Sequence, residues 1–282
     1  QSGEVEFAIA DLIKDVKLLE LARENAAYDA RHMERLCYNC RMLAEALQLT
    51  VEYGSIISDE FIDTIELAAP LCDLGNVAIS ADILQKDGEL TEEEIEVMRT
   101  HTTIGSRIIS DVQRVGEYNE FLQMSYDIAL YHHEYYDGSG YPNRISGNAI
   151  SLFGRICAVA DVYDALTTDR PYRVAMQPYD AMKILVAGID KHFDPQILNT
   201  FIRKFSIYPA GSLVKLNDGS VALVLRNNPK AVIRPVIKII TNPRGRHLKE
   251  RIEVDLLNDK KLFITGPADR SVLNVTAKNA NM

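Results

Sequence analysis

The sequence has 282 residues, of which 47% are hydrophobic and 25% charged, with a formal net charge of -9. This length and composition indicate a globular protein with one large or two small domains, each with a full core. The acidic balance argues against a nucleic-acid polymer as partner, since phosphate binding needs a basic face. No apolar run reaches the roughly 20 residues that a bilayer-spanning helix requires.

Apolar residues recur at helical spacing through about the first 205 residues. Residues 1–24 predict a helix that we interpret as a connector from an upstream domain, with the first helix of the core as the alternative. Residues 25–206 are expected to form a helical domain. Its helices are predicted at 25–49, 59–74, 118–134, 152–168, 178–190 and 194–205, with a further helix that starts at Thr91 and carries His101 and Ile109.

Two local signals mark helix ends. Gly75 follows the apolar stretch 59–74 and is a natural helix stop, because glycine adopts the conformation that closes a helix. Thr91 and Glu94 have the spacing of a capping box, which predicts the start of the next helix.

The apolar period changes after Pro209. Residues from Gly211 onward alternate in polarity, and Asp218-Gly219 has the sequence of a hairpin turn. We therefore predict a small β-rich extension over 207–282, with frayed residues at its end. The overall fold class is mainly α.

Four cysteines occur in the sequence, two of them in a C-x-x-C pair, Cys37 and Cys40. No second such pair exists, and the segment has a helical pattern. A buried helical face is therefore favoured over a zinc knuckle or a redox pair. Unpaired cysteines fit a reducing cytoplasm, which is the expected location.

The stretch YHHEYYDGSGYP, residues 131–142, carries the strongest chemical signal. Neighbouring residues in a helix point about 100° apart, but at a helix end His132 and His133 can converge on one object. Imidazole is the commonest metal ligand, so that object is interpreted as a metal ion. The alternative is a surface turn with two solvated histidines.

Other potential metal ligands lie in apolar surroundings along the chain. Asp73 and Asp161 occupy apolar helical runs, where a buried carboxylate needs a metal ion or an arginine as partner. A metal site in a helical bundle gathers ligands from several helices. The candidate set is His32, Cys72, Asp73, His101, His132, His133 and Asp161.

Several ordered motifs resemble those of the HD-GYP branch of the HD-domain phosphohydrolases. The resemblance covers about residues 25–275. Its motifs are RHMERL at 31–36, LCDLGNVAISADILQKDGELTEEEIEVMRTHTTIGSRII at 71–109, HHEYYDGSGYP at 132–142, ADVYDALTTDRPYR at 160–173 and KHFDP at 191–195.

The resemblance implies an HD-domain helical bundle that hydrolyses a cyclic dinucleotide, chiefly cyclic di-GMP, with two divalent transition-metal ions. Iron is the first expectation, with manganese or zinc as alternatives. Two such ions can activate water and clamp phosphate oxygens. The catalytic Asp73 should bridge them. The remaining ligands would divide into one site with His101, His132 and His133 and another with His32, Cys72 and Asp161.

The resemblance also implies substrate contacts and partners. Arg170 and Arg173 could bind phosphate or guanine, and Tyr141 could line the base pocket. Asp137 is expected to accept a hydrogen bond from the N–H of a metal-binding histidine without contacting the metal itself. Hydrogen bonds that only fix the loops are the alternative role for these residues. A regulatory protein or upstream sensor domain is the expected macromolecular partner, and the N-terminal helix could form a homodimer.

The chain departs from the family pattern at three positions. The His of the family's His-Asp dipeptide is Cys72, which is either a thiolate ligand or a small buried residue at a site that has lost one ligand. The family's Lys three residues after the Asp is Asn76, so a cation expected at the substrate phosphate is missing. The Glu that members with a third metal carry is replaced by Tyr28, which argues against a third ion.

Two functions follow from these observations. The first is a working phosphodiesterase, which the retained loop and most of the ligands favour. The second is a sensor or interaction module that binds metal or dinucleotide without cleaving it, which the losses at Cys72 and Asn76 favour.

Overall fold

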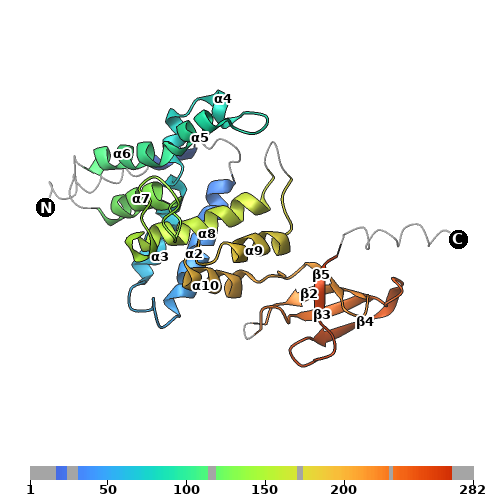
Figure 1. Ribbon diagram of the computed structural model, residues 1–282. Helices are drawn as coiled ribbons and strands as arrows, with labels where there is room; N and C mark the ends of the chain where they lie inside the picture. Colours follow the sequence, from blue (N-terminus) through green and yellow to red (C-terminus); the bar gives the residue numbers. More distant parts are fainter. Residues whose placement is uncertain (1–16, 24–30, 114–118, 170–173, 229–230, 269–282) are drawn as a thin grey trace. The chain divides into compact units, whose positions relative to one another are not determined.

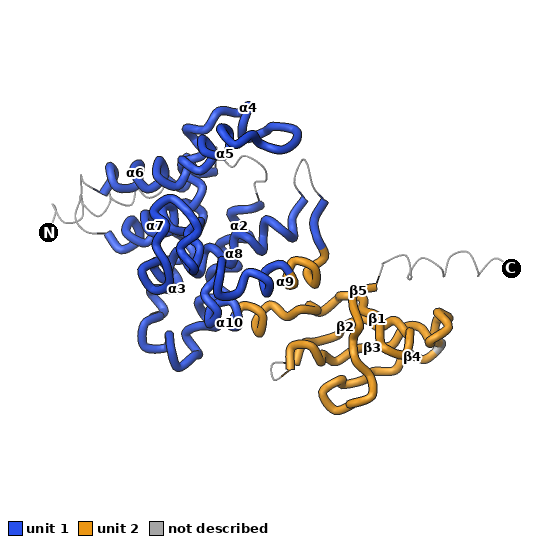
Figure 2. Tube along the Cα trace, viewed as in Figure 1, with its two compact units in different colours: residues 1–176, 184–200 blue, residues 177–183, 201–282 orange. Residues whose placement is uncertain are grey.

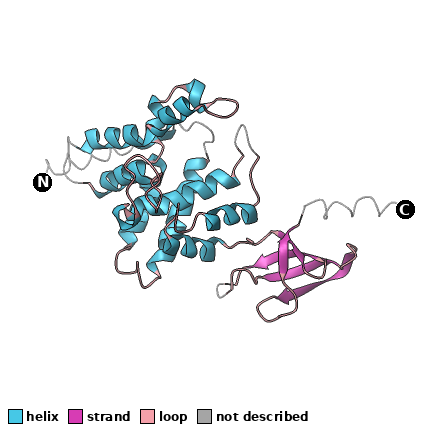
Figure 3. Ribbon diagram, in the orientation of Figure 1, coloured by secondary structure: helices cyan, strands magenta, loops and turns pink. Residues whose placement is uncertain are grey.

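The computed structural model describes residues 17–23, 31–113, 119–169, 174–228 and 231–268. It divides into two compact units (Figure 1, Figure 2). The helical unit takes in residues 1–176 and 184–200, and the C-terminal unit takes in 177–183 and 201–282. Figure 3 shows strands only in the C-terminal part of the described chain. The expected mainly-α fold with a β-rich C-terminal region is confirmed.

The helical unit is built around α2 (His32–Gln48), which packs against α3 (Asp59–Ala68) and α8 (Leu152–Thr167). The buried face of α2 carries residues three and four apart, among them Leu36, Leu43 and Leu47. This spacing places them on one side of a helix, where burial of each side chain stabilises the fold by about 1.5–3 kcal/mol.

The described part of the N-terminal segment belongs to the helical core. Residues 17–23 are helical, and Leu18 and Ala22 are buried in a cluster with Met33 and Leu71. This packing favours the alternative reading of the segment, as a core helix rather than a connector. The rest of 1–24, and Tyr28, lie outside the described residues.

The helix predicted over 59–74 ends earlier than expected. Ser58 caps its start, since the Ser58 side chain accepts a hydrogen bond from the Phe61 N–H. Pro70 then lacks the N–H that would continue an α-helix, and the chain passes into two short 3-10 turns, η1 (Ala69–Leu71) and η2 (Leu74–Ala78). Cys72 and Asp73 lie in the turn between them, outside any regular helix.

Gly75 does not end that helix but lies inside η2. Its role is close approach between backbones. A Cβ built at Gly75 would lie 1.9 Å from the carbonyl oxygen of His101 and 2.7 Å from the backbone nitrogen of Gly105. Only a residue without a side chain lets η2 lie directly on the start of α6.

The single helix expected from Thr91 to beyond Ile109 is divided into α5 (Glu92–Arg99) and α6 (His101–Gln113), with α4 (Ala81–Leu84) before them. The capping box at Thr91 and Glu94 is confirmed. At the break, the Thr100 hydroxyl donates to the Val97 carbonyl and His101 Nδ1 lies 2.7 Å from the Met98 carbonyl. Side chains thus satisfy the last carbonyls of α5 and end it.

The remaining helices complete the bundle. α7 (Glu120–Tyr131) starts at an Asn119 cap and packs against α3, α6 and α8. A short turn, η3 (Gly147–Ala149), precedes α8. The two last helices, α9 (Pro178–Ala187) and α10 (Pro195–Phe205), lead to the C-terminal unit. No described helix is long and apolar enough to cross a bilayer.

The C-terminal unit holds a five-stranded antiparallel sheet in the order β4-β3-β2-β1-β5. One face packs Val214, Ala222, Val224 and Ile237 against Tyr208. Alternate residues of each strand share a face, and this alternation is the sequence signal that predicted the sheet. The strands are β1 (Leu213–Leu216), β2 (Val221–Arg226), β3 (Val236–Thr241), β4 (His247–Asp255) and β5 (Ile264–Pro267).

A Gly75→Ala substitution should separate η2 from α6. The new Cβ would overlap the His101 carbonyl, so the unfolding temperature should fall by several degrees, as for overpacking of about 1–3 kcal/mol, and His101 should shift. Gly266→Ala is the matched control, because a Cβ there meets nothing within 4 Å. Equal unfolding temperatures for the two variants in a thermal melt would contradict this packing.

Candidate metal centre

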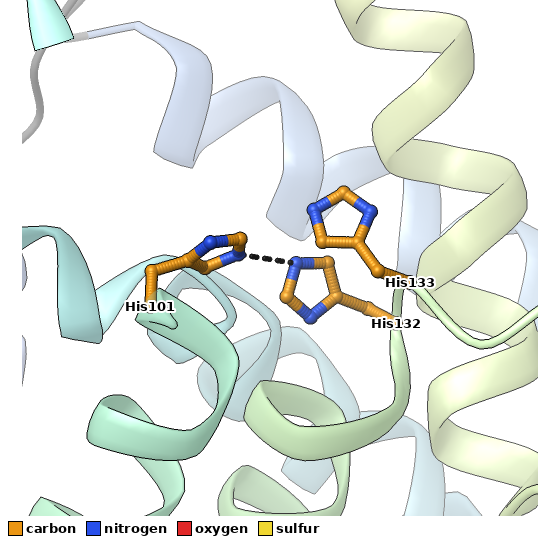
Figure 4. Close-up of side chains that lie close together, drawn as sticks. All are labelled: His101, His132 and His133. Carbon is orange, nitrogen blue, oxygen red and sulfur yellow. Dashed lines mark hydrogen bonds between the residues drawn. The ribbon is translucent and has the colours of Figure 1, made fainter. Parts of the chain in front are cut away.

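Three histidines, from the start of one helix and the end of another, converge in the helical unit (Figure 4). His101 is the first residue of α6, while His132 and His133 follow the last residue of α7. Each offers a ring nitrogen, and these atoms all lie within 4.8 Å of one another. The expected convergence of the adjacent pair beyond a helix end is therefore found, and we call these residues the three-histidine cluster.

The protonation of two of these rings follows from their hydrogen bonds. His101 Nδ1 lies 2.7 Å from the Met98 carbonyl, and His132 Nδ1 lies 2.9 Å from the Ile128 carbonyl. A carbonyl only accepts, so each Nδ1 must carry the proton. In the neutral rings both Nε2 atoms therefore have lone pairs, and they face each other at 3.4 Å. This is the geometry in which a shared cation stabilises both.

Burial keeps the cluster neutral. His101 and His132 are each only 2% exposed. Burial lowers the pKa of both, and the nearby carboxylate of Asp73 only partly offsets it. Burial and the neighbouring imidazoles lower the pKa of His133 well below its ordinary value. Neutral imidazole is the form that binds a metal ion, so these donors fit a transition metal.

A second group of donors adjoins the first. Ligand atoms of His32, Cys72 and Asp73 lie within 4.8 Å of one another. Asp161 Oδ1 lies 3.8 Å from His32 Nε2. The carboxylate of Asp73 also lies 3.6 Å from His101 Nε2. Asp73 thus stands at both groups, and we call His32, Cys72, Asp73 and Asp161 the His32 cluster.

Asp164 is a residue of this centre that sequence reasoning missed. It is 2% exposed and lies one helical turn after Asp161 on α8. His32 Nδ1 lies 2.7 Å from Asp164 Oδ2. Arg35 donates to both oxygens of the same carboxylate. The bond holds the His32 ring by one nitrogen and leaves Nε2 directed at the cluster.

The signals for Asp164 were present in the sequence but needed pairing. His32 and Arg35 lie one turn apart on α2, and Asp161 and Asp164 lie one turn apart on α8. Each helix therefore offers two residues on one face, but only the packing of α2 against α8 shows which of them meet.

The His32 cluster carries protons that a cation would displace. Burial alone would lower the pKa of His32, but its ring bonds to Asp164 and Cys72 raise that pKa to about 11. The Cys72 side chain is 1% exposed. Contact with the thiol of Cys157 and burial raise the pKa of Cys72 well above its ordinary value. Without a cation, Cys72 is therefore a thiol.

The segment 134–147, which we call the GYP loop, covers the three-histidine cluster. The Tyr141 ring stacks on His133 with centroids 4.9 Å apart. The Tyr141 N–H donates to the His133 carbonyl, and the Asn143 N–H donates to the buried carboxylate of Glu134 at 2.6 Å. A Cβ at Gly140 would lie 2.2 Å from the Tyr135 nitrogen, so glycine is required there for the loop to close on itself.

The closing stretch KHFDP anchors this loop. The N–H groups of Tyr136 and Asp137 donate to the carbonyls of His192 and Lys191. The His192 ring packs against the Tyr135 ring with centroids 3.9 Å apart and an angle of 34° between the planes. Burial lowers the pKa of His192 to about 4, so the ring is neutral in this contact.

The other predicted site residues take different places. Asp137 was expected to hold a histidine N–H, but its carboxylate accepts from the backbone and hydroxyl of Ser139, so it fixes the loop, which was its alternative role. Asn76 is buried, and its Oδ1 has no hydrogen-bond partner among the described residues. Arg170 and Arg173 lie outside the described residues.

The C-x-x-C pair lies on the helical face that the sequence predicts. Cys40 is fully buried and Cys37 half-buried. Cys40 contacts Cys157, which in turn contacts Cys72. Within the described residues, the potential metal-binding groups include neither Cys37 nor Cys40.

Residues 17–197 match the HD-domain family, and residues 213–274 match a KOW domain associated with the HD domain. The chain belongs to the HD-domain family. Its metal-ligand geometry and GYP loop also agree with the HD-GYP branch that the motifs predicted, and so do its relatives.

Relatives of this HD-domain chain include three named enzymes. It is 34% identical to a cyclic di-GMP phosphodiesterase of Pseudomonas aeruginosa, over 81% of this chain and 52% of that protein. It is 43% identical to the cyclic di-GMP phosphodiesterase response regulator RpfG of Xanthomonas campestris, over 61% of this chain and 42% of that protein. It is 35% identical to a 3'3'-cGAMP-specific phosphodiesterase of Vibrio cholerae, over 64% of this chain and 32% of that protein. The chain thus spans about half or less of these relatives.

Removing the carboxylate behind His32 should weaken metal binding. In Asp164→Asn the amide oxygen can still accept a hydrogen bond from His32, but it carries no negative charge to strengthen that bond. The affinity for a metal ion at the His32 cluster should therefore fall about 10–100-fold. Titration calorimetry with Mn(II) would measure it. Asp137→Asn is the control, since Asp137 faces Ser139 and its exchange should leave affinity unchanged. Equal affinities in the two variants would disprove the role of Asp164.

The two clusters should differ in their response to pH. The His32 pKa of about 11 means that a proton competes with the cation up to that pH. Affinity at the His32 cluster should therefore rise at least about tenfold per pH unit between pH 7 and 9. The three-histidine cluster is already neutral, so its metal affinity should not change over this pH range. Chelator competition at each pH would measure both, and a pH-independent His32 cluster would show that His32 is not a ligand.

Proposed function

We propose that this chain hydrolyses a phosphodiester bond of a cyclic dinucleotide, with cyclic di-GMP as the first candidate, at a centre for two divalent cations. The observation that carries the proposal is the pair of neutral Nε2 atoms of His101 and His132, 3.4 Å apart, beside a carboxylate shared with a second donor group. The names of the relatives supply the substrate class.

The donor set fits two transition-metal ions. Three imidazoles and a carboxylate suit iron, manganese or zinc at the three-histidine cluster. His32, Asp161 and the shared Asp73 suit the same ions at the other, and Cys72 adds a soft sulfur donor. When bound, such a pair would supply a water of lowered pKa and Lewis-acid stabilisation of phosphate oxygens. Iron remains our first proposal for the ion.

The residues of the chain do the positioning. The Asp73 side chain is 41% exposed, so the shared carboxylate lies where a substrate can reach it, while the imidazole of His101 beside it stays buried. Backbone carbonyls fix the rings of His101 and His132, and Asp164 fixes that of His32. Fixed ligands keep the donor geometry in place before the substrate arrives, which is how preorganised sites lower a reaction barrier.

A polar hollow of about 550 Å³ runs along α6 and α7 and has Asn143 of the GYP loop among its lining residues. We take it as the candidate space for part of the substrate. Thr103, Ser106 and Arg107 line it. Tyr141, stacked on His133, remains our candidate for a residue that lines the base pocket.

A specific observation also favours a second function, a sensor that binds without cleaving. Cys72 is a buried thiol held against Cys157, and Asn76 is a neutral side chain where the family has a positively charged lysine. If Cys72 keeps its proton, the His32 cluster loses a donor and the three-histidine cluster alone would hold an ion.

Anaerobic loading with Fe(II) or Mn(II) should give a protein that cleaves cyclic di-GMP. His132→Ala removes one of the facing Nε2 atoms and should reduce turnover by about two orders of magnitude or more, beyond the effect of losing an outer partner. Product formation by liquid chromatography would measure it. Absence of turnover with two ions bound per chain would refute the hydrolase and leave the sensor.

The metal content of Cys72→Ala and Cys72→His separates the two readings of Cys72. If the thiol is a ligand, the parent binds about two ions and Cys72→Ala binds fewer. If the site has decayed, the parent binds about one, and only Cys72→His binds two. Elemental analysis on anaerobically purified protein gives the count.

A further inference from the structure

Arg99 lies at the edge of the three-histidine cluster. It is the last residue of α5, two positions before His101. Its guanidinium carbon lies 5.2 Å from the centre of the Tyr141 ring. That ring stacks on His133, with an angle of 24° between the planes. One aromatic ring therefore separates a cation from a candidate metal ligand.

The Arg99 head is open to a ligand. Its side chain is 45% exposed, and the ion pair it makes, with Glu96, involves a carboxylate that is 69% exposed. Exposed pairs of this kind add little stability, because water competes for both partners. A phosphate oxygen can therefore replace Glu96 while the Tyr141 ring continues to hold the guanidinium in place.

The substrate proposed above calls for such a cation. A cyclic dinucleotide carries two phosphodiester groups, each with one negative charge, and the ions at the centre act on the one that is cleaved. Asn76 is neutral and buried, so it offers the other group no charge. Arg35 is bound through two N–H groups to Asp164. Arg99 has the charge, the exposure and the position that these two residues lack.

The hollow of about 550 Å³ along α6 and α7 is our candidate space for the second half of the substrate. Two of its lining residues follow the Arg99–Tyr141 pair closely in the chain: Thr103, four residues after Arg99, and Asn143, two residues after Tyr141. A nucleoside in that hollow would leave its phosphate near the Arg99–Tyr141 pair. A planar guanidinium can donate two parallel N–H groups to such a phosphate.

We propose that Arg99 is a substrate-binding residue, which donates to the phosphodiester that is not cleaved and takes the place of the cation missing at Asn76. This inference rests on the proposed function. It adds a residue to the site that neither the motifs nor the residues of the metal centre identify.

The test compares Arg99→Ala and Arg99→Lys with the parent in Mn(II)-loaded protein. Loss of a charged hydrogen bond should raise the KM for cyclic di-GMP at least about tenfold in Arg99→Ala, with kcat within about twofold. Arg99→Lys keeps the positive charge but lacks the two parallel N–H donors of a guanidinium, so its KM should lie between those of the parent and Arg99→Ala. Metal content and unfolding temperature should stay at the parent values, because the Arg99 side chain contacts the Glu96 carboxylate and the Tyr141 ring and the substitution leaves the backbone unchanged.

Arg226→Ala is the matched control, since Arg226 is an exposed arginine paired with a glutamate, Glu253, in the C-terminal unit. Its KM should equal that of the parent. If the parent cleaves and Arg99→Ala has the parent KM, the role of Arg99 is wrong and the proposed function stands. If Arg99→Ala loses metal or unfolds earlier, its role is structural and the inference also fails. If the metal-loaded parent neither binds nor cleaves cyclic di-GMP, the proposed function itself fails.

Discussion

Two lone pairs that face each other across 3.4 Å, on His101 and His132, are the constraint on which the helical unit depends. Carbonyls of α5 and α7 hold the opposite nitrogens, so neither ring can turn to relieve the contact. The ends of three helices must therefore meet with little freedom. The backbone contact at Gly75 has the same effect, because it presses η2 and the carboxylate of Asp73 against the start of α6.

The second half of the centre is built on different chemistry. The three-histidine cluster is neutral because burial lowers the pKa of each ring. The pKa of His32 is raised instead, because its contacts with Asp164, Cys72 and Asp161 together outweigh burial. A cation would enter the first cluster without displacing a proton and the second only by displacing one or two. Cys72 sharpens this difference, since its thiol is buried against Cys157. The two halves thus share Asp73 but differ in how readily they fill.

The GYP loop connects the candidate metal centre to the proposed substrate contacts. It begins directly after the candidate ligands His132 and His133, and its Tyr141 folds back onto His133. Backbone hydrogen bonds to the 188–193 turn and the buried Glu134 hold the loop rigid from both sides. A rigid loop keeps an aromatic surface and the nearby Arg99 in one place, which reduces the entropy lost when a large flexible ligand binds.

The sequence by itself determined that the chain up to about residue 205 is helical and that the part after Pro209 forms a sheet, since helical spacing, the Thr91 cap and the alternating C-terminal strands are local signals. It did not predict α4, the 3-10 turns η1, η2 and η3, or the break between α5 and α6. The sequence also supplied the candidate ligands, which the resemblance divided between two sites. In the structure His101, His132 and His133 form one group and His32, Cys72 and Asp73 another. Only the tertiary structure decided the contacts of Asp164, Gly75 and Arg99. Each depends on a contact between residues that lie far apart in the chain or across a helix break, and no local pattern specifies which faces meet when helices pack.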